Sequence, residues 1–518
     1  MVNGANKKII FISILLITLT FINFKRQSNM NIKKIDYIIT EAKQPDSYDP
    51  IKADATNNLT IMRMSYSTIL QVNDKNELYS NVLSEFNYDF ESKTITFKIN
   101  KEFQYEDGTS ISIQDILIPI LRVAYTHKNF PVLKDIIGYE EWINKPNQLL
   151  NYPKGIQINE DTITIKLEKD YSNPLFRFCL EIFSVIPSSC IDLKTNQITC
   201  ERPTESGYYK LSERENNKFK FTRRSKLSAI NDKVNYDFIN IVFQNDIDLC
   251  DHQINKNTIL AGNETQITQQ EIQKCQNQIT WLPASRFGMI LINPNLPPFN
   301  KKQNRRFFAE KIREYLQKNY QDLNVESSIF TKIIPGYIPK QESNSEKIDL
   351  KDFQNVNFYI PTFSKTAHKQ TISAINVIAK ELKMNIINLN TSPGIDSIQS
   401  FTNNKASVMI GSSGFWPQDP VGDMKMFFSK NFHQPLKFLW EDKKLEELYT
   451  QINDTDTNLD IKMRELNLHI NDQSLLCPIL HFKRFFITKS KIQENNLPVT
   501  SVTSPAPWQI NLNENEIN

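Results

Sequence analysis

The stretch from Phe287 to Leu316 constrains the fold most strongly, because it joins a strand pattern to a helix pattern across a proline-rich turn. Its first residues, 287–292, form a short apolar run, which is typical of a buried strand. The prolines that follow forbid regular structure. From Asn304 onwards, aromatic and aliphatic residues recur at spacings of three and four, which predicts an amphipathic helix. A strand, a turn and a helix in this order form one unit of an α/β layer.

Strand and helix patterns alternate again further along the chain. Residues 357–360 have the pattern of a strand, residues 368–382 that of an amphipathic helix, and residues 384–389 that of a second strand. This order predicts a parallel sheet with a right-handed crossover. At 518 residues the chain is too long for one ordinary core, so we expect two or three lobes.

The N-terminal segment, residues 1–26, predicts export. Lys7 and Lys8 precede a mostly apolar run at 9–24, and two more basic residues follow it, as in a signal peptide. We find neither a small-x-small cleavage site after the run nor a lipoprotein cysteine, so cleavage and retention as a membrane anchor both stay open. The run is short for crossing a hydrocarbon core of about 30 Å. Without the basic residues of this segment the chain is nearly neutral, which argues against a nucleic-acid surface.

The 6 cysteines favour disulfides, because an even number in an exported chain is typical of a disulfide framework. The most local pairings, and therefore our candidates, are Cys190 with Cys200 and Cys250 with Cys275. Buried free thiols are the alternative. No Cys-x-x-Cys pair occurs and the 6 histidines are scattered, so the sequence predicts no metal site and no cofactor. No nucleophile and base form a known catalytic motif, which predicts a protein that is not an enzyme.

Residues 93–122 contain the most specific pattern in the chain. A strand with alternating apolar residues at 94–100 is followed by an Asp107-Gly108 turn and by a helix that begins after Ser112. Acidic residues suit both a turn and a helix start, so we interpret the aspartates of this segment as structural.

This segment resembles the long signature of solute-binding protein family 5, the peptide and nickel binding proteins of ABC transporters. The residues with counterparts in that signature are Phe97, Asp107, Gly108, Thr109, Asp115 and Arg122. The stretch Phe287–Leu316 is similar to another family motif through Asn293, Pro297, Pro298, Phe299 and Arg305 or Arg306. Weaker matches are the Asp46–Pro50 turn, the hairpin pattern at Ile156–Leu167, Gly207 with Tyr209, and the Ile334–Pro339 turn. The resemblance is colinear from about Ile35 to about Ser490.

The resemblance implies an α/β, two-lobed fold of the class II periplasmic-binding-protein type, with an extra subdomain inserted into lobe I. The expected division is 1–26 as signal peptide or anchor, 30–51, 160–265 and 478–518 as lobe I, 52–159 as the inserted subdomain, and 266–477 as lobe II. The two lobes would close on a ligand by a hinge motion. A helical pattern at 57–70 would lie close to the ligand cleft, as it does in the family.

The loop Gly411–Pro420 bears most directly on the ligand. Asp419 and Pro420 match the end of the family's G-W-x-x-D-y-x-D-P motif. Trp416 stands where peptide binders have an aspartate that pairs with the ligand's α-amine. An indole offers stacking or cation–π contact instead of a charge-assisted bond, which argues against free-amine peptides and leaves the ligand open. The candidates for ligand contact are Trp416, Phe415, Asp419, Asp54 and Tyr66.

We therefore expect an extracytoplasmic solute-binding protein that acts as a monomer. It would capture a peptide or peptide-like small solute between its lobes and hand it unaltered to an ABC permease in the inner membrane. Neither a cofactor nor a nucleic acid is expected as a partner. Two alternatives stay open, a binding protein tethered by residues 9–24 with a sensory or scaffold role, and an exported hydrolase.

Overall fold

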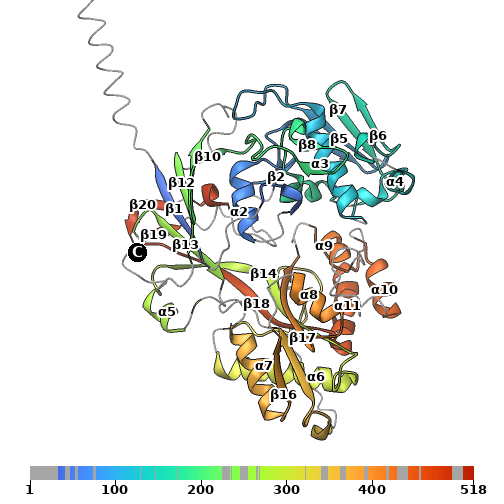
Figure 1. Cartoon of the computed structure of the whole chain (residues 1–518), viewed down its shortest axis with the longest axis vertical. Coiled ribbons are helices and arrows are strands. Elements are labelled where there is room, and N and C mark those ends of the chain that lie inside the picture. The colour runs from blue at the N-terminus through green and yellow to red at the C-terminus, as the bar shows by residue number, and fades with distance from the viewer. Residues whose placement is uncertain are drawn as a thin grey trace, which may run out of the picture.

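The computed structural model has a mixed α/β fold with two lobes, as the sequence predicted (Figure 1). The first lobe contains the N-terminal half of the described chain and its C-terminal strands, and the second lobe contains residues from about 287 to 480. The structure describes residues 33–517 except for 41–46, 53–55, 74–76, 129, 146–147, 172, 225–233, 235, 245–254, 264–266, 268, 321–322, 340–347, 362–368, 390–394, 416–418, 429–441, 454–456, 493–505 and 511.

One eight-stranded mixed sheet extends through both lobes. Its strands lie in the order β10 (Tyr209–Glu215), β11 (Lys218–Arg223), β12 (Phe238–Gln244), β1 (Lys34–Thr40), β13 (Thr258–Asn263), β18 (Leu476–Ile487), β14 (Ile279–Ile292) and β17 (Val408–Gly414). Strand β1 is parallel to both of its neighbours, and the other neighbouring pairs are antiparallel. Ile35 and Tyr37 of β1 are buried, as expected for a central strand.

The long strands β14 and β18 connect the two lobes (Figure 1). At their first-lobe end Ile279 pairs with Ile487, and β13 lies on the other side of β18. At their second-lobe end Leu291 pairs with Leu476, and β17 lies on the other side of β14. The register shifts just before Arg286, so a bulge interrupts the ladder where one lobe passes into the other.

A four-stranded antiparallel sheet forms the outer part of the first lobe. Its strands lie in the order β4 (Leu83–Asp89), β5 (Thr94–Ile99), β7 (Thr162–Lys166) and β6 (Ile156–Asn159). Because β7 pairs with β5, this sheet continues past residue 159. Phe97 of β5 and Ile35 of β1 belong to one continuous hydrophobic core, together with residues of helix α3 (Ile113–Thr126). This outer sheet and the first-lobe part of the large sheet therefore pack as one body.

The aspartates of the 93–122 segment have the structural roles that the sequence predicted. Asp107 accepts a hydrogen bond from a backbone N–H two residues further on, at 2.9 Å, and Gly108 has a φ of +87°. At the start of α3, Asp115 accepts a hydrogen bond from the backbone N–H of Ser112 at 2.8 Å. Its other oxygen accepts one from the backbone N–H of Ser188 at 2.7 Å. The carboxylates of Asp107 and Asp115 are thus both engaged in hydrogen bonds to the backbone.

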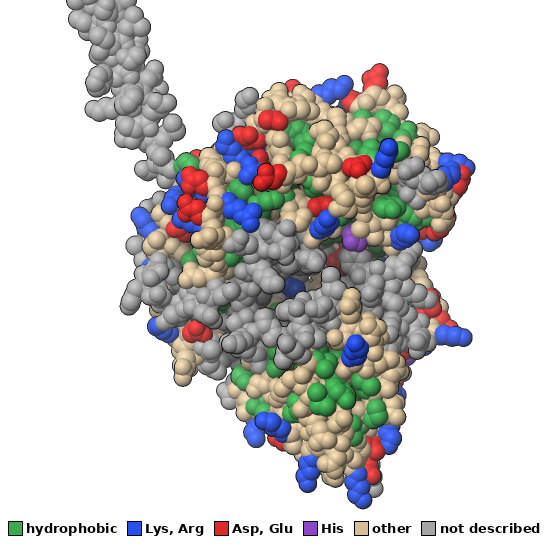
Figure 2. Space-filling model, in the orientation of Figure 1, with side chains coloured by type: hydrophobic (Ala, Val, Ile, Leu, Met, Phe, Trp, Pro, Cys, Tyr) green, Lys and Arg blue, Asp and Glu red, His purple; other side chains and the backbone are tan. Residues whose placement is uncertain are grey.

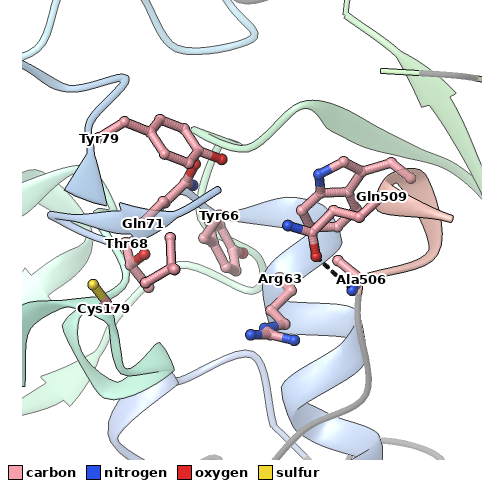
Figure 3. A pocket seen from close by; sticks show the side chains of 10 residues that line it. Arg63, Tyr66, Thr68, Gln71, Tyr79, Cys179, Ala506 and Gln509 are labelled. Carbon is pink, nitrogen blue, oxygen red and sulfur yellow. Dashed lines mark hydrogen bonds between the residues drawn. The ribbon is translucent and has the colours of Figure 1, made fainter. Parts of the chain in front are cut away.

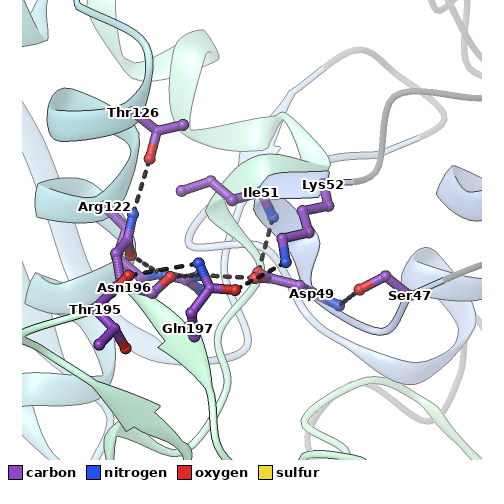
Figure 4. A network of polar contacts seen from close by, with 9 residues as sticks. All are labelled: Ser47, Asp49, Ile51, Lys52, Arg122, Thr126, Thr195, Asn196 and Gln197. Carbon is purple, nitrogen blue, oxygen red and sulfur yellow. Dashed lines mark hydrogen bonds and ion pairs between the residues drawn. The ribbon is translucent and has the colours of Figure 1, made fainter.

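Arg122, the last residue of that segment, holds Asp49 from within the first lobe (Figure 4). Its guanidinium is buried and forms an ion pair with Asp49 at 2.9 Å. Its Nε donates a hydrogen bond to Asn196 Oδ1 at 2.7 Å. Asn196 lies in a short hairpin that the Cys190–Cys200 disulfide encloses. This disulfide is one of the two local pairings expected from the sequence.

The remaining described cysteines differ in state. Cys275 is disulfide-bonded, and Cys250, its expected partner, lies outside the described residues. Cys179 and Cys477 are buried free thiols. Burial raises the pKa of both thiols, so neither is activated as a nucleophile.

In the second lobe, the predicted strand–turn–helix unit and the parallel strand pair are both present. Helix α6 (Lys302–Asn319) follows β14, and helix α7 (Lys369–Glu381) connects the parallel strands β15 (Asn357–Pro361) and β16 (Asn385–Leu389). Phe299, in the proline turn, packs its ring on Phe308 and Phe358, with centroids 5.1 and 5.9 Å apart. The other helices described in this lobe are α8 (Ile395–Thr402), α9 (Pro420–Phe427), α10 (Lys443–Thr450) and α11 (Leu459–Gln473).

Short elements complete the fold. They are α2 (Thr56–Ser65), α4 (Tyr139–Ile143), α5 (Gln269–Lys274), β2 (Gln71–Val72), β3 (Leu78–Tyr79), β8 (Ile191–Asp192), β9 (Gln197–Ile198), β19 (Ser490–Ile492) and β20 (Leu512–Ile517). Helix α2 ends at Ser65, earlier than the predicted end at residue 70. The chain leaves the helix there because the backbone of Ser67 bonds to Ser206 Oγ and to the N–H of Val185. Within the described residues, no helix combines the length and apolarity needed to cross a membrane.

Candidate ligand site

Arg177 of the first lobe reaches into the second lobe and joins the two. It lies in a 3-10 helix, Pro174–Cys179, and its side chain is almost fully buried. Its Nη1 donates to Asp423 Oδ1 of α9 at 2.5 Å, and its Nη2 forms an ion pair with the Asp419 carboxylate. The same Nη2 also donates to the backbone carbonyl of Asp419 at 3.1 Å. One guanidinium therefore holds the end of the predicted ligand loop and the start of α9.

The two carboxylates keep the buried Arg177 guanidinium positively charged. Burial alone lowers the pKa of Arg177, but the two carboxylates, Asp419 and Asp423, more than offset this and raise it above the ordinary value. Gly422 makes the approach possible, because a Cβ there would lie 2.5 and 2.6 Å from the two Asp419 carboxylate oxygens and closer still to Arg177. No side chain larger than hydrogen fits at this position without displacing the pair.

The first lobe contains a pocket whose lining includes Cys179, from the same 3-10 helix as Arg177 (Figure 3). Its walls come from α2, β2, β3, the 3-10 helix of Arg177 and a C-terminal 3-10 helix, Pro507–Gln509. Its aromatic lining residues are Tyr66, Tyr79 and Trp508, and its polar ones include Arg63, Thr68, Gln71 and Gln509. The cavity between these side chains has a volume of about 50 Å³ and opens to solvent. Aromatic walls with a few polar groups suit a small organic solute.

The polar groups of the pocket are held by neighbours in the first lobe. Arg63 forms an ion pair with Glu181 at 2.6 Å. The hydroxyl groups of Tyr79 and Tyr208 are 3.1 Å apart, and burial raises the pKa of Tyr79 well above its ordinary value. The Tyr79 phenol therefore stays protonated and neutral. Arg63 is the positively charged residue of the lining, and Glu181 balances its charge. Figure 3 shows Gln71 and Tyr79 on one side of the space and Gln509 on the other.

The sequence-predicted contact residues are only partly brought together. Tyr66 lines the pocket, although its ring is buried and its hydroxyl donates to the carbonyl of Pro203 at 3.1 Å. Asp419 is engaged by Arg177. Phe415 lies in the second-lobe core, where its ring stacks on that of Phe287 with centroids 5.6 Å apart. Trp416 and Asp54 lie outside the described residues.

Sequence reasoning missed Arg177, Arg63 and Trp508. For Arg177 a signal was present, because a cation inside the apolar run Leu175–Leu180 stays charged when buried only if carboxylates neutralise it. The other two lie in segments whose patterns do not distinguish a pocket wall from a surface.

His481 is a buried and hydrogen-bonded core residue. Its Nε2 lies 2.7 Å from the carbonyl oxygen of Ser328, and its exposed fraction is 1%. Burial lowers its pKa to about 4, so the ring is neutral at pH 7. Within the described residues, no three His, Cys, Asp or Glu side chains are grouped so that they could hold a metal ion.

The fold and this interlobe geometry correspond to a known family. Residues 77–434 match the family model described as bacterial extracellular solute-binding proteins, family 5 middle. The chain therefore belongs to family 5 of the bacterial extracellular solute-binding proteins, which are binding proteins rather than enzymes. No curated protein sequence matches the chain.

Solved structures of the same fold are similar to this chain over most of its length. Haemophilus influenzae OppA in complex with the peptide RPPGFSPFR has a TM-score of 0.70 at 12% identity and covers 90% of this chain and 96% of its own. Escherichia coli MppA, a murein tripeptide binding protein, has a TM-score of 0.70 at 15% identity, with coverages of 89% and 96%. The unliganded open form of MppA has a lower TM-score, 0.58, at 15% identity and coverages of 89% and 95%.

Proposed function

We propose that this protein binds a small solute between its lobes, outside the cytoplasm, and delivers it unaltered to a membrane ABC permease. The observation that carries the proposal is the buried contact of Arg177 with Asp419 and Asp423 across the two lobes. This contact gives the two lobes a defined closed arrangement. A first-lobe pocket that includes Cys179 of the same 3-10 helix supports the proposal. Membership of an extracellular solute-binding family supports the same function.

The arrangement of the lobes is that of a closed binding protein. Supporting this, the chain is more similar to one MppA structure, with a TM-score of 0.70, than to the unliganded open form, with 0.58. Strands β14 and β18, with the bulge before Arg286, are the hinge about which the lobes would separate.

The solute is a peptide or a peptide-like small molecule. OppA and MppA bind a peptide and a murein tripeptide, which supports this class of ligand. Tyr66, with Trp416 and Asp54 if their loops reach the pocket, would contact the solute directly. Asp419 and Phe415 would act differently from the sequence expectation, by fixing the loop that carries Trp416 to Arg177 and to the second-lobe core.

We propose the same lobe division as from the sequence, with the inserted subdomain extended. Lobe I comprises 30–51, 160–265 and 478–518, and lobe II comprises 266–477. The insertion begins at 52, and β7 belongs to its sheet, so its end moves from 159 to about 166. Limited proteolysis tests this division, because cuts between stable fragments should fall near these limits.

Native mass spectrometry of the protein purified from cells tests the binding function. The expected spectrum contains the chain with one additional small mass, which leaves on denaturation and re-binds stoichiometrically in calorimetry. Recovery of a chemically altered solute after incubation would instead support the exported hydrolase. Absence of both a retained mass and calorimetric binding of extracted extracytoplasmic solutes would contradict the proposal.

Two further parts of the proposal concern state and location. The protein acts as a monomer, which light scattering after size exclusion should report as a mass near 60.4 kDa for the full chain. It is extracytoplasmic and either released or tethered by residues 9–24. Membrane fractionation, with N-terminal sequencing of the mature chain, distinguishes these two outcomes.

A further inference from the structure

The hairpin that the Cys190–Cys200 disulfide encloses, called the disulfide hairpin below, packs against a wall of the first-lobe pocket. Met62 of helix α2 and Tyr66, directly after the helix, are fully buried and belong to one hydrophobic cluster with the hairpin. Tyr66 also lines the pocket. The hairpin residues of this cluster are Ile191, Leu193 and Ile198.

Polar contacts fix the tip of the disulfide hairpin to helix α3. Asn196 turns the chain with a φ of +56°, and its Nδ2 donates to Thr126 Oγ1 at 3.0 Å. Its Oδ1 accepts a hydrogen bond from Arg122 at 2.7 Å. Arg122 in turn forms the buried ion pair with Asp49, directly before the 3-10 helix Pro50–Lys52. One side chain of α3 therefore holds both the hairpin and the chain that leads into α2.

The segment after the disulfide bonds to the pocket residue Tyr66 itself. The Tyr66 hydroxyl donates to the carbonyl oxygen of Pro203, three residues beyond Cys200, at 3.1 Å. Burial raises the pKa of Tyr66, so the hydroxyl keeps its proton and remains a donor. The ring of Tyr66 is thus held by the hairpin and its hydroxyl by the residues that follow. If the hairpin moved, both contacts would be lost together.

The disulfide keeps this hairpin in place. Strands β8 and β9 have two residues each, and a two-stranded hairpin is marginal on its own. Because the bond joins residues 10 positions apart, it restricts the conformations open to the segment when its side chains leave the cluster. A pocket wall held in one conformation binds a guest at a lower entropic cost. The covalent link therefore acts on the pocket from outside it.

Resting on the proposed function, we infer that the disulfide hairpin holds Tyr66 and α2 in place and thereby sets the affinity for the solute. Asn196 and Arg122 are positioning residues, because they act through the hairpin and through Asp49. The disulfide thus has a role in binding and not only in stability. Family membership leaves this role open.

Two buried free thiols report on the pocket wall and on the rest of the protein. Cys179 lines the same pocket, and Cys477 lies in the second-lobe core as an internal reference. Charged side chains of both signs are interspersed over the first lobe in Figure 2, so neutral iodoacetamide keeps surface charge out of the measurement. The full-length protein is labelled without reductant, which leaves the disulfide of Cys275 intact. Peptide mapping by mass spectrometry then gives a rate for each thiol.

Cys179 should become selectively accessible when the hairpin is released. In the double variant Cys190→Ser/Cys200→Ser its labelling should be about tenfold to hundredfold faster, with the rate of Cys477 unchanged. Asn196→Gly keeps the left-handed turn but removes the amide, and should accelerate Cys179 severalfold. Asn355→Gly makes the same change at a φ of +60° in the second lobe and, as the matched control, should label like the wild type.

Two labelling results would overturn the inference. One is an unchanged Cys179 rate in a folded double variant. The other is an equal acceleration of Cys179 and Cys477, because it would mean that the whole protein is destabilised and not the pocket wall. If the double variant does not fold, Asn196→Gly decides by the same two criteria.

Calorimetry with the solute recovered from the wild type supplies the second arm. Both hairpin variants should bind that solute severalfold more weakly, and Asn355→Gly should bind it as the wild type does. Equal affinities in spite of faster Cys179 labelling would overturn the inference and leave the transport function standing. A wild type that retains no solute and binds none would contradict the proposed function, whereas selective labelling of Cys179 would still support the hold of the hairpin on the pocket wall.

Discussion

Two groups of arginines lie where the two lobes meet, and their surroundings differ. Arg177 is neutralised by Asp419 and Asp423, and the contact crosses from one lobe to the other. Arg286 and Arg484 lie on neighbouring strands of the large sheet, and the Nε of Arg286 is buried without a hydrogen-bond acceptor among the described residues. The first group is complete within the protein and holds it closed.

The largest expected effect is on the neutralised group. Arg177→Met leaves two buried carboxylates without their counter-charge, which should lower the free energy of unfolding by about 3–5 kcal/mol. Urea unfolding followed by tryptophan fluorescence measures this. A loss below about 1 kcal/mol would mean that the lobes are not closed by this contact in solution.

A buried histidine on β18 sharpens the comparison, since His481 lies close to Arg484 in the chain but is neutral. Its folded pKa of about 4 is below the ordinary 6.5, so the unfolded chain binds more protons between these values. Stability should therefore be full above about pH 6.5 and fall as the pH drops towards 4, by about 2–3 kcal/mol from this residue. His481→Gln should show a shallower fall across that window. Identical pH profiles for the two proteins would refute the neutral assignment.

A smaller effect is expected at Gly422, where the Arg177 contact is crowded. Gly422→Ala puts a Cβ against Arg177 and Asp419, which should cost about 1–3 kcal/mol and shift the population towards open lobes. Small-angle scattering should then report a larger radius of gyration. Gly411→Ala is a matched control, because a Cβ there meets only one flexible methionine methyl, at 3.4 Å. Equal radii for the two variants would show that the crowding is absorbed locally.

The smallest effect is expected at an exposed pair. Arg464 and Asp460 are 2.9 Å apart on α11, with about half of each side chain exposed. Arg464→Gln should change the free energy of unfolding by no more than about 1 kcal/mol, because solvent screens such pairs. Chemical unfolding at two salt concentrations checks this. A loss as large as that of Arg177→Met would remove the basis of the comparison.

Much of the fold could be predicted from local pattern. The proline turn after β14, helix α6, and the strand–helix–strand unit around α7 each follow from short-range spacing, and the structure contains all of them. The predicted helix at 57–70 was too long, because the backbone of Ser67 pairs with residues far along the chain. Periodicity alone contains no information about such distant partners.

The candidate site was less predictable. The sequence singled out the loop of Asp419, but it assigned that carboxylate to a ligand, whereas in the structure Arg177 engages it. Arg63 and Trp508 line one pocket although they are far apart in the chain. Arg286 and Arg484 lie on one face only because β14 and β18 pair antiparallel in a particular register.

The sequence by itself determined the class of this protein, because strand and helix periodicity and turn residues are local properties that a chain of amino acids states directly. It also determined the family, through colinear short motifs. Only the tertiary structure decided which charges meet. Whether carboxylates neutralise a buried arginine depends on side chains hundreds of residues apart, and their distances are fixed by strand register and lobe closure.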